Sequence, residues 1–466
     1  MSKPSLARGT RDFGTEKMIR RNFIFDQIKS VFQKFGFLQI ETPAIENLSV
    51  LMGKYGEEGD QLLFKILNSG DFLEKSTAAD LESGYKKMTA KISEKGLRYD
   101  LTVPFARFVV MNRNDLVMPF KRYQIQPVWR ADRPQRGRYR EFYQCDADVV
   151  GTDSLICEAE IVMMLQECMQ KIGIENVEIK INNRKILSGI AEVIGLEGQE
   201  ATLCVAIDKL DKIGQEKVEA ELLEKGFPAE AIAKLQPLFE NVGDANQIFD
   251  FLRTWLSASE IGRKGVHELE RVFELVTSFG ADTSNLKLDI TLARGLSYYT
   301  GAIFEVKALD KYKNPVQIGS ISGGGRYDNL TGAFGAPGLS GVGISLGVDR
   351  IYDVMEELNI FPEEVGSTTK VLITNFDAAA EKYALPILKS FRDANIKAEI
   401  YPDYSKLKKQ FEYADRKKIG FVLVIGSEEM ETGQLTLKDL NSGNQTKKSL
   451  AEVIEVLVEK GKNLFV

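Results

Sequence analysis

Histidine is almost absent from this chain. His267 is the single histidine among 466 residues, and it lies in a charged stretch with helical periodicity. Catalytic triads and most zinc sites use histidine as a base or a ligand, so the composition argues against both. We expect His267 to be a surface or satisfied helix residue.

Cysteines are few, and long apolar runs are missing. The four cysteines show no Cys-x-x-Cys spacing, which predicts reduced, packed thiols in place of a metal site or a disulfide framework. No run of about eighteen apolar residues is available to cross a bilayer, and the opening MSKPSLARGTRDF has no apolar signal core. We therefore expect a cytoplasmic protein without a membrane partner.

Excess positive charge is also lacking. The formal net charge is -6, with 44% hydrophobic and 27% charged residues. This composition suits two or three packed domains and argues against non-specific binding of polyanions by the whole surface. Any contact with nucleic acid must therefore be local.

Arginines are nevertheless concentrated in residues 129–151, which read WRADRPQRGRYREFYQCDADVVG. Arg138, Arg140 and Phe142 alternate with other side chains, as expected of a strand, and PQRG supplies a turn after the strand-like RYQIQPVWR. The pattern predicts a long hairpin with arginines at its tip. Guanidinium groups beside an aromatic ring suit a nucleotide, whereas the alternative is a solvated basic turn.

Three other segments contain residues suited to ligand binding. They read GLRYDLTVPFARF at 96–108, LDITLARGLSYYTGAIFE at 288–305, and GSISGGGRYDNLTGAFG at 319–335 followed by GVGISLGVDRIYDVM at 341–355. Arg294 offers a permanent cation after a predicted strand, and Tyr298 and Tyr299 offer hydroxyls. The glycines allow close approach of the backbone to a ligand, although a flexible turn explains them as well.

Together these segments resemble class II aminoacyl-tRNA synthetases, in the form found in histidyl-tRNA synthetases. Residues 129–151 resemble motif 2, residues 288–305 the histidine-specific signature, and residues 341–355 motif 3. The predicted helix at 16–35 and the following GFLQIETPAIE resemble motif 1, which forms a homodimer interface in that family. The resemblance runs nearly from end to end.

The resemblance implies a set of nucleotide contacts. Arg130 and Arg294 would flank the α-phosphate of ATP as the catalytic residues. Phe142 would lie under the adenine, and Arg350 would lie against the γ-phosphate and adenine. Arg138 would contact the distal phosphates or the acceptor end of tRNA.

The resemblance also implies that six side chains bind histidine: Asp100, Thr102, Gln144, Asp148, Tyr298 and Tyr299. The first three would hold the α-ammonium group. Asp148 would accept a proton from the imidazole ring, and one of the two tyrosines would contact the opposite nitrogen. Ser297 stands where many relatives carry aspartate.

The chemistry of acyl adenylate formation fits these residues. A carboxylate approaches an anionic phosphate, so fixed cations such as Arg130 and Arg294 would stabilise the transition state, each by about 3 kcal/mol or more. Mg²⁺ bridging the β- and γ-phosphates would assist the departure of pyrophosphate. The attacking carboxylate is ionised at neutral pH, so this step needs no protein base.

We predict an α+β fold with four segments. Residues 1–187 and 283–362 would form a catalytic domain around an antiparallel sheet, interrupted at 188–282 by a helical insertion that clamps the acceptor stem of tRNA. The candidate phosphate contacts in this insertion are Lys209, Lys212, Arg263 and Lys264.

Residues 363–466 alternate strands with helices, which predicts a small α/β domain with a largely parallel sheet. It resembles the anticodon-binding domain shared by several class II enzymes. One predicted helix concentrates positive charge at Lys406, Lys408, Lys409, Arg416, Lys417 and Lys418, for which a solvated helix face is an equal explanation.

The predicted activity is that of a histidine-tRNA ligase. It would convert L-histidine and ATP to histidyl-adenylate and transfer histidine to the 3' end of tRNA(His). The alternative is a catalytically silent, histidine-binding paralogue, such as the regulatory subunit of ATP phosphoribosyltransferase. Such paralogues usually lose motif arginines and the C-terminal domain. This chain contains the motif arginines and a predicted C-terminal domain.

Overall fold

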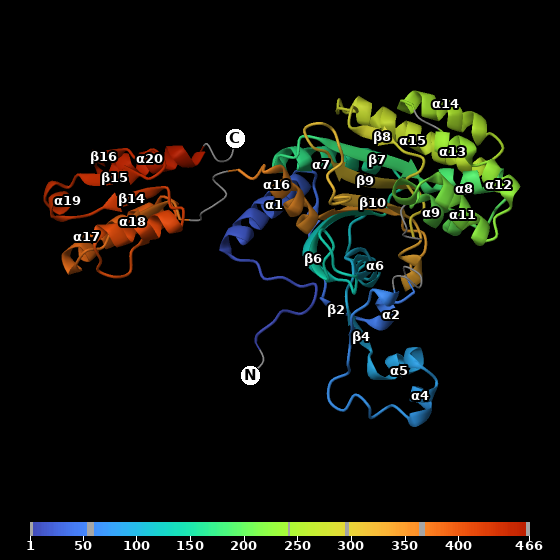
Figure 1. Ribbon diagram of the computed structural model, residues 1–466, viewed down its shortest axis with the longest axis horizontal. Helices are drawn as coiled ribbons and strands as arrows, with labels where there is room; N and C mark the ends of the chain where they lie inside the picture. The colour runs from blue at the N-terminus through green and yellow to red at the C-terminus, as the bar shows by residue number, and fades with distance from the viewer. Residues whose placement is uncertain (1–2, 54–59, 241–242, 294–297, 363–368, 463–466) are drawn as a thin grey trace. The chain divides into compact units, whose positions relative to one another are not determined.

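The computed structural model of the chain describes residues 3–53, 60–240, 243–293, 298–362 and 369–462. These residues form two compact units. Figure 1 colours the chain by residue number from its amino terminus to its carboxyl terminus. The first unit comprises Met1–Asp12 and Ile24–Ile360, and the second comprises Phe13–Phe23 and Phe361–Val466.

The first unit is built on an eight-stranded sheet with the order β1-β5-β6-β11-β10-β9-β7-β8. Its strands are β1 (Leu38–Gln39), β5 (Phe120–Trp129), β6 (Glu141–Val150), β7 (Val177–Asn183), β8 (Leu286–Leu288), β9 (Ala302–Ala308), β10 (Ser322–Tyr327) and β11 (Gly341–Gly347). The six central strands pair antiparallel, and β1 and β8 join the two edges in parallel. The predicted antiparallel catalytic fold is confirmed.

The hairpin of β5 and β6 is the longest pairing in this sheet. Phe120 lies opposite Val150, and Trp129 lies opposite Glu141, so residues 130–140 form the connecting tip. The hairpin predicted from the arginine-rich segment is therefore present. Gly137 in the tip has φ of 70°, a left-handed conformation that glycine adopts without steric cost.

Helices and a small sheet surround the large sheet. Outside the helical insertion, the helices up to Ile360 are α1 (Thr15–Lys34), α2 (Leu48–Leu51), α4 (Ala78–Glu82), α5 (Tyr85–Ile92), α6 (Thr102–Met111), α7 (Ile156–Ile172) and α16 (Val348–Leu358), with a 3₁₀ turn η1 at Gly332–Phe334. The small sheet has the order β2-β4-β3, formed by Ile45–Asn47, Lys95–Leu97 and Lys65–Ile66. Helix α7 packs against β11, and α16 packs against β6 and β11.

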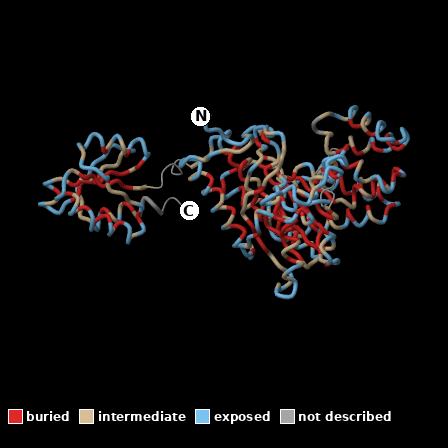
Figure 2. The backbone as a smooth tube through the Cα atoms, turned by 90° about the horizontal axis from the view of Figure 1, so that it is seen from below, coloured by how far each residue is buried: buried red, intermediate tan, exposed pale blue. Residues whose placement is uncertain are grey.

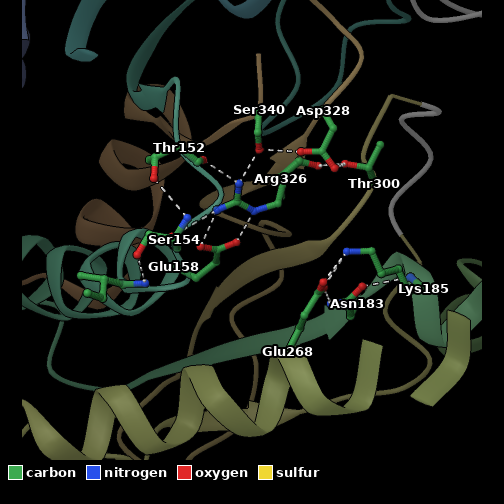
Figure 3. A network of polar contacts seen from close by, with 11 residues as sticks. Thr152, Ser154, Glu158, Asn183, Lys185, Glu268, Thr300, Arg326, Asp328 and Ser340 are labelled. Carbon is green, nitrogen blue, oxygen red and sulfur yellow. Dashed lines mark hydrogen bonds and ion pairs between the residues drawn. The ribbon is translucent and has the colours of Figure 1, made fainter. Parts of the chain in front are cut away.

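Between β7 and β8 the chain is helical, as predicted for the insertion. Its helices are α8 (Arg184–Val193), α9 (Glu200–Ile207), α10 (Leu210–Ile213), α11 (Gln215–Glu224), α12 (Ala229–Ala233), α13 (Gln236–Glu240), α14 (Ala245–Trp255) and α15 (Glu260–Ser278). Strand β7 ends at Asn183, whose side chain accepts a hydrogen bond from Lys185 N and caps α8. Asn183 and Lys185 also contact Glu268 of α15 (Figure 3).

Buried charge holds the sheet to α7. The Arg326 Nε atom of β10 donates to Glu158 of α7 at 2.5 Å, and its Nη1 atom donates to Ser340 at 2.5 Å (Figure 3). Asp328 accepts from Ser340 and from Thr300, both at 2.6 Å. Arg326 and Glu158 are almost fully buried, so each needs the other to offset its loss of hydration. This network connects β10, α7 and the start of β9.

The second unit contains a five-stranded sheet with the order β13-β12-β14-β15-β16. Its elements are β12 (Val371–Ile373), α17 (Ala378–Asp393), β13 (Ala398–Ile400), α18 (Leu407–Arg416), β14 (Phe421–Val424), α19 (Ser427–Thr432), β15 (Leu435–Asp439), β16 (Gln445–Lys448) and α20 (Leu450–Lys462). Strands β13, β12 and β14 are parallel to one another, as predicted. Strand β15 pairs antiparallel with β14 and with β16. Buried residues lie in the interior of this unit (Figure 2), and they come from its strands and from helices α17 and α20.

Candidate active site

A cavity of about 360 Å³ opens between the β5–β6 hairpin, the central strands and α6. Its lining includes ten residues that the sequence analysis proposed for substrate binding: Asp100, Thr102, Arg130, Arg138, Phe142, Gln144, Asp148, Tyr298, Tyr299 and Arg350. Arg294 and Ser297 lie outside the described residues. Side chains from four separate segments of the sequence thus share one cavity.

Strand β6 carries polar side chains on its cavity face. Gln144 and Asp148 line the cavity, and Asp146 occupies the position between them on the same face. The Gln144 Nε2 atom donates to the Ser345 hydroxyl of β11 at 2.7 Å. All three side chains are buried, which is costly for carboxylates and therefore indicates specific partners or a ligand.

Asp148 has two close partners that sequence reasoning missed. The Arg122 Nη2 atom of β5 lies 2.8 Å from Asp148 Oδ2, and the Tyr327 hydroxyl donates to Asp148 Oδ1 at 2.8 Å. Arg122 is fully buried, with its guanidinium 4.3 Å from the centre of the Phe105 ring. The signal in the sequence was the charged residue Arg122 in the strand-like run RYQIQPVWR. A charge inside a sheet indicates an acid on the neighbouring strand, because a buried charge needs a partner.

The carboxylates around the cavity bind protons unusually tightly. Burial raises the pKa of Asp100 to about 7, against the opposing effect of the Arg130 charge. Burial also raises the pKa of Asp146 to about 7, opposed by Arg122 and reinforced by Asp148. The pKa of Asp148 is raised by burial too, while Arg122 and the Tyr327 hydrogen bond oppose this rise. A cationic ligand would favour the ionised forms.

Two adjacent tyrosines form another wall of the cavity. The rings of Tyr298 and Tyr299 lie 4.5 Å apart, and the Tyr298 hydroxyl donates to the Tyr299 hydroxyl at 3.3 Å. Burial raises the pKa of Tyr298 well above its ordinary value. Tyr298 therefore stays neutral and can both donate and accept hydrogen bonds.

Arg130 marks the point where the hairpin tip begins. Its Nε atom donates to the Tyr99 carbonyl at 2.9 Å, and its guanidinium lies 5.2 Å from the centre of the Phe142 ring. Arg138, further along the tip, lies 3.8 Å from the Asp132 carboxylate with 49% of its side chain exposed. Cations and an aromatic ring thus border one end of the cavity.

Arg350 joins the hairpin tip to the segment before β10. Its Nε atom donates to the Gly137 carbonyl, and its Nη1 atom donates to the Ser320 carbonyl, both at 2.7 Å. Beside it, the Arg11 guanidinium lies 3.2 Å from the centre of the Tyr139 ring and pairs with Asp349. The tip is therefore supported by α16 and by the amino-terminal segment.

The glycine cluster forms the floor of the cavity. A flexible turn was one reading of this cluster, but Ser322–Tyr327 is a buried strand. A Cβ atom at Gly324 would lie 2.0 Å from the Gly343 carbonyl oxygen, and one at Gly343 would lie 2.1 Å from Asp148 Oδ1. Only glycine allows these two strands to approach so closely beside the carboxylate.

Residues proposed outside the cavity have ordinary structural surroundings. His267 is exposed on α15, and the four cysteines are free and buried. Lys209 pairs with Glu221 at 2.6 Å, and Arg263 and Lys264 are exposed. In the second unit, Lys417 pairs with Glu399 at 2.9 Å.

Metal and membrane sites do not emerge from the described residues. Among them, no group of three or more histidine, cysteine, aspartate or glutamate side chains is arranged to hold a metal ion. Within the same part of the chain, no helix combines the length and apolarity needed to span a lipid bilayer.

The arrangement has two chemically distinct ends. Arg130, Arg138 and Arg350 surround the hairpin tip beside Phe142, which suits phosphate groups and a planar base. Buried carboxylates and tyrosines border the other end, which suits a cationic group and a ring with N–H donors. The cavity can therefore bring a small cationic molecule to a nucleotide phosphate.

Family models match most of the chain. The model described as histidyl-tRNA synthetase matches residues 66–351, and the model described as anticodon binding domain matches residues 370–460. Among curated proteins, the histidine--tRNA ligase of Cytophaga hutchinsonii is 59% identical over 98% of this chain and 100% of that protein. The histidine--tRNA ligase of Bacteroides fragilis strain YCH46 is 54% identical, with the same shares covered.

Solved structures share the fold. The histidyl-tRNA synthetase from Nostoc sp. PCC 7120 aligns with a TM-score of 0.84 and 29% identity, covering 99% of this chain and 100% of that one. A structure described as an ATP phosphoribosyltransferase regulatory subunit/histidyl-tRNA synthetase, from Bacillus halodurans C, has a TM-score of 0.70 and 20% identity. It covers 91% of this chain and 100% of that one, and at this identity the likeness concerns the fold alone.

The close approach at Gly343 gives a test of the cavity floor. Gly343→Ala would displace the Asp148 carboxylate from Arg122 and Tyr327, so we expect the free energy of unfolding to fall by about 1–3 kcal/mol in urea denaturation. Gly332→Ala is the control, because its Cβ atom would meet no atom closer than 3.6 Å. It should change the stability by less than about 0.5 kcal/mol. Equal effects of the two substitutions would contradict this account of the floor.

Proposed function

We propose that this chain, which belongs to the histidyl-tRNA synthetase family, is a histidine-tRNA ligase that joins L-histidine to tRNA(His) with ATP as the energy source. One observation supports the proposal above the others. The buried acids and tyrosines expected to bind histidine and the arginines expected to bind ATP line the same cavity.

The histidine end of the cavity provides partners for each polar group of the amino acid. Asp100, Thr102 and Gln144 would hold the α-ammonium group, since a carboxylate, a hydroxyl and an amide oxygen all accept hydrogen bonds. Asp148 would accept from the imidazole N–H, and Tyr298 or Tyr299 would contact the other ring nitrogen. An uncompensated buried acid costs stability, and the bound ligand would remove this cost.

The nucleotide end would bind ATP through the hairpin. Arg130 would contact both the histidine carboxylate and the α-phosphate, and Phe142 would stack on the adenine. Arg138 would contact the distal phosphates or the acceptor end of tRNA, and Arg350 would lie against the γ-phosphate and adenine. Arg350 already bonds two carbonyl groups, so in this role it would also position the hairpin tip.

The first chemical step is attack of the histidine carboxylate on the α-phosphorus. A bond forms between a carboxylate oxygen of histidine and the α-phosphorus, and the bond between that phosphorus and pyrophosphate breaks. Negative charge builds on the phosphate oxygens in the transition state, where Arg130 would stabilise it more than in the ground state. Arg294 is proposed to act from the opposite side of the phosphate. In the second step the ribose hydroxyl at the 3' end of tRNA would attack the histidyl carbonyl carbon. An ester bond forms, the bond to AMP breaks, and a phosphate oxygen of the departing AMP would take the hydroxyl proton.

Mg²⁺ belongs to the proposal only as a companion of ATP. The described residues contain no preformed cluster of three metal-binding side chains. Magnesium commonly binds through substrate phosphates with one or two carboxylates, so we expect it to enter with the nucleotide.

The proposed binding partners and cellular location are inferred from the family to which the chain belongs. The segment matched by the anticodon-binding model supports binding of tRNA(His) by the second unit. The helical segment at 188–282 is proposed to contact the acceptor stem, and α1 with β1 is proposed to contribute to a homodimer. A cytoplasmic location completes this proposal. The boundaries 1–187, 188–282, 283–362 and 363–466 stay a proposed division.

A catalytically silent, histidine-binding paralogue is the second candidate. It has less support, because Arg130 and Arg350 line the cavity and the C-terminal unit is present. Purified protein should catalyse histidine-dependent exchange of pyrophosphate into ATP, and it should charge tRNA(His). Histidine binding without any exchange would favour the paralogue, and absence of both would reject the proposed function.

Arg130 provides a quantitative test of the catalytic role. Arg130→Ala should lower kcat for pyrophosphate exchange by about 100-fold or more, the usual loss when one preorganised donor to a developing charge is removed. The KM for histidine should change far less, because the charge appears mainly in the transition state. Arg113→Ala is the control, since Arg113 is exposed after α6 and lies outside the cavity lining. A raised KM for histidine with an unchanged kcat would make Arg130 a binding residue only.

The raised pKa of Asp100 predicts that this carboxylate lowers the stability of the free protein at neutral pH, although histidine binding requires it. Because its folded pKa is raised to about 7, its stabilising contribution is full below about pH 4 and is lost as pH rises through 7. Asp100→Asn should therefore gain stability over the ligand-free wild type as pH rises from 5 to 8, by an amount on the order of 1 kcal/mol or more in urea denaturation. Histidine-dependent exchange should be lost, because an amide lacks the charge that pairs with ammonium.

The exposed Asp153→Asn serves as the control for this pH series. It should show the same stability relative to wild type at both pH values. A constant difference for Asp100→Asn would mean that Asp100 is ionised in the free protein.

A further inference from the structure

Two residues beneath the histidine end of the cavity have no role in the proposed function. Arg122 and Asp146 are buried, and neither lines the cavity. Antiparallel pairing of β5 with β6 places Arg122 opposite Asp148 and Gln124 opposite Asp146. The guanidinium is therefore held beside two carboxylates that project from the same face of β6.

One oxygen of the Asp148 carboxylate makes no hydrogen bond to the described residues. Asp148 Oδ1 accepts from Tyr327, whereas Oδ2 lies 2.8 Å from Arg122 Nη2 and makes no hydrogen bond to any described residue. The contact with Arg122 is thus an ion pair without hydrogen-bond geometry. Oδ2 is buried, and its capacity to accept a hydrogen bond is not used by any described residue.

We propose that Arg122 and Asp146 form a charge-balancing pair that keeps Asp148 ionised and basic, so that Asp148 can accept the imidazole N–H of histidine. The inference rests on the proposed function, because it assigns the ligand of Asp148. Arg122 and Asp146 are positioning residues in this account. They act on the substrate only through Asp148.

The charge balance explains why both residues are needed. With Arg122 alone, the guanidinium charge would lower the pKa of Asp148 further, and the ionised carboxylate would be a weaker acceptor. With Asp146 alone, two buried carboxylates on one strand face would repel, and one of them would take up a proton. One guanidinium against two carboxylates leaves a single net negative charge, which matches one N–H donor of the ligand.

Neighbouring groups are consistent with this balance. Titratable or charged groups that act on the two carboxylates or close the same space come from β5, β6, β10, α6 and their connections: Asp100, Arg122, Arg130, Asp146, Asp148, Tyr298 and Tyr327. Burial raises the pKa of both Asp146 and Asp148, and the Arg122 charge is the largest effect opposing that rise in each. Arg122 is thus the principal group that favours their ionised forms.

The pair can be tested by a double-mutant cycle in histidine-dependent pyrophosphate exchange. Arg122→Leu should raise the KM for histidine by about tenfold, the effect of a one-unit rise in the pKa of Asp148 above the assay pH. Asp146→Asn lowers that pKa and should raise the KM by a smaller factor, because Asp148 stays ionised but accepts less strongly. The KM for ATP should stay nearly constant. The double variant restores the net charge, so its KM for histidine should lie at or below that of Arg122→Leu, whereas independent residues would give the product of the two single increases.

The pH profile separates an electrostatic role from a structural one. Without Arg122, Asp148 binds its proton more tightly, so the defect of Arg122→Leu relative to wild type should shrink as pH rises from 6 to 9. Arg122→Lys keeps the charge and should retain a histidine KM nearer to wild type than Arg122→Leu. Lys121→Leu is the matched control, because Lys121 is the preceding residue of β5 and pairs with Glu160 at 2.6 Å. Its histidine KM should not change.

The outcomes distinguish this inference from the function on which it rests. Wild-type protein without histidine-dependent exchange would reject the proposed function. Active wild-type protein with additive effects in the cycle, or with a pH-independent defect, would reject the charge-balancing pair alone. Should Arg122→Leu fail to fold, Asp146→Asn and Arg122→Lys still decide the matter, because an unchanged histidine KM in Asp146→Asn would overturn the proposal.

Discussion

Charge buried between neighbouring strands is the constraint on which this site depends. A carboxylate inside a sheet is tolerated only with a partner, and the antiparallel register of β5 and β6 supplies Arg122 to Asp148. Because backbone hydrogen bonds hold both strands, neither side chain can leave the other without a large cost. The position of the acid in the cavity is therefore set by the sheet itself.

The surrounding structure maintains this register. Gly324 lets β10 lie close to β11, and Gly343 lets β11 lie against the Asp148 carboxylate, because a Cβ atom at either position would collide with its neighbour. On the same strand, Arg326 bonds Glu158 and Ser340, which joins β10 to α7. Arg350 holds the hairpin tip by two carbonyl groups. Rigid support of this kind keeps the two ends of the cavity at a constant separation, which a reaction between two bound substrates requires.

Much of the fold and part of the cavity lining could be predicted from sequence. The hairpin followed from alternation and a Pro-Gly turn, and ten proposed residues line one cavity, although their roles stay predictions. The glycine cluster was harder to interpret, because a turn and a crowded strand use the same residue type. The end of β7 depends on the cap formed by Asn183, which only the local backbone conformation shows.

By itself, the sequence determined which chemical groups are present and which are scarce. One histidine, arginines at alternating positions and paired tyrosines restrict the chemistry to binding and electrostatic stabilisation. Only the tertiary structure decided that Arg122 forms an ion pair with Asp148, because residues 26 positions apart in the chain meet through strand register. Burial then raised the pKa of these acids, since a carboxylate responds to the water and charges around it, and sequence spacing alone contains neither.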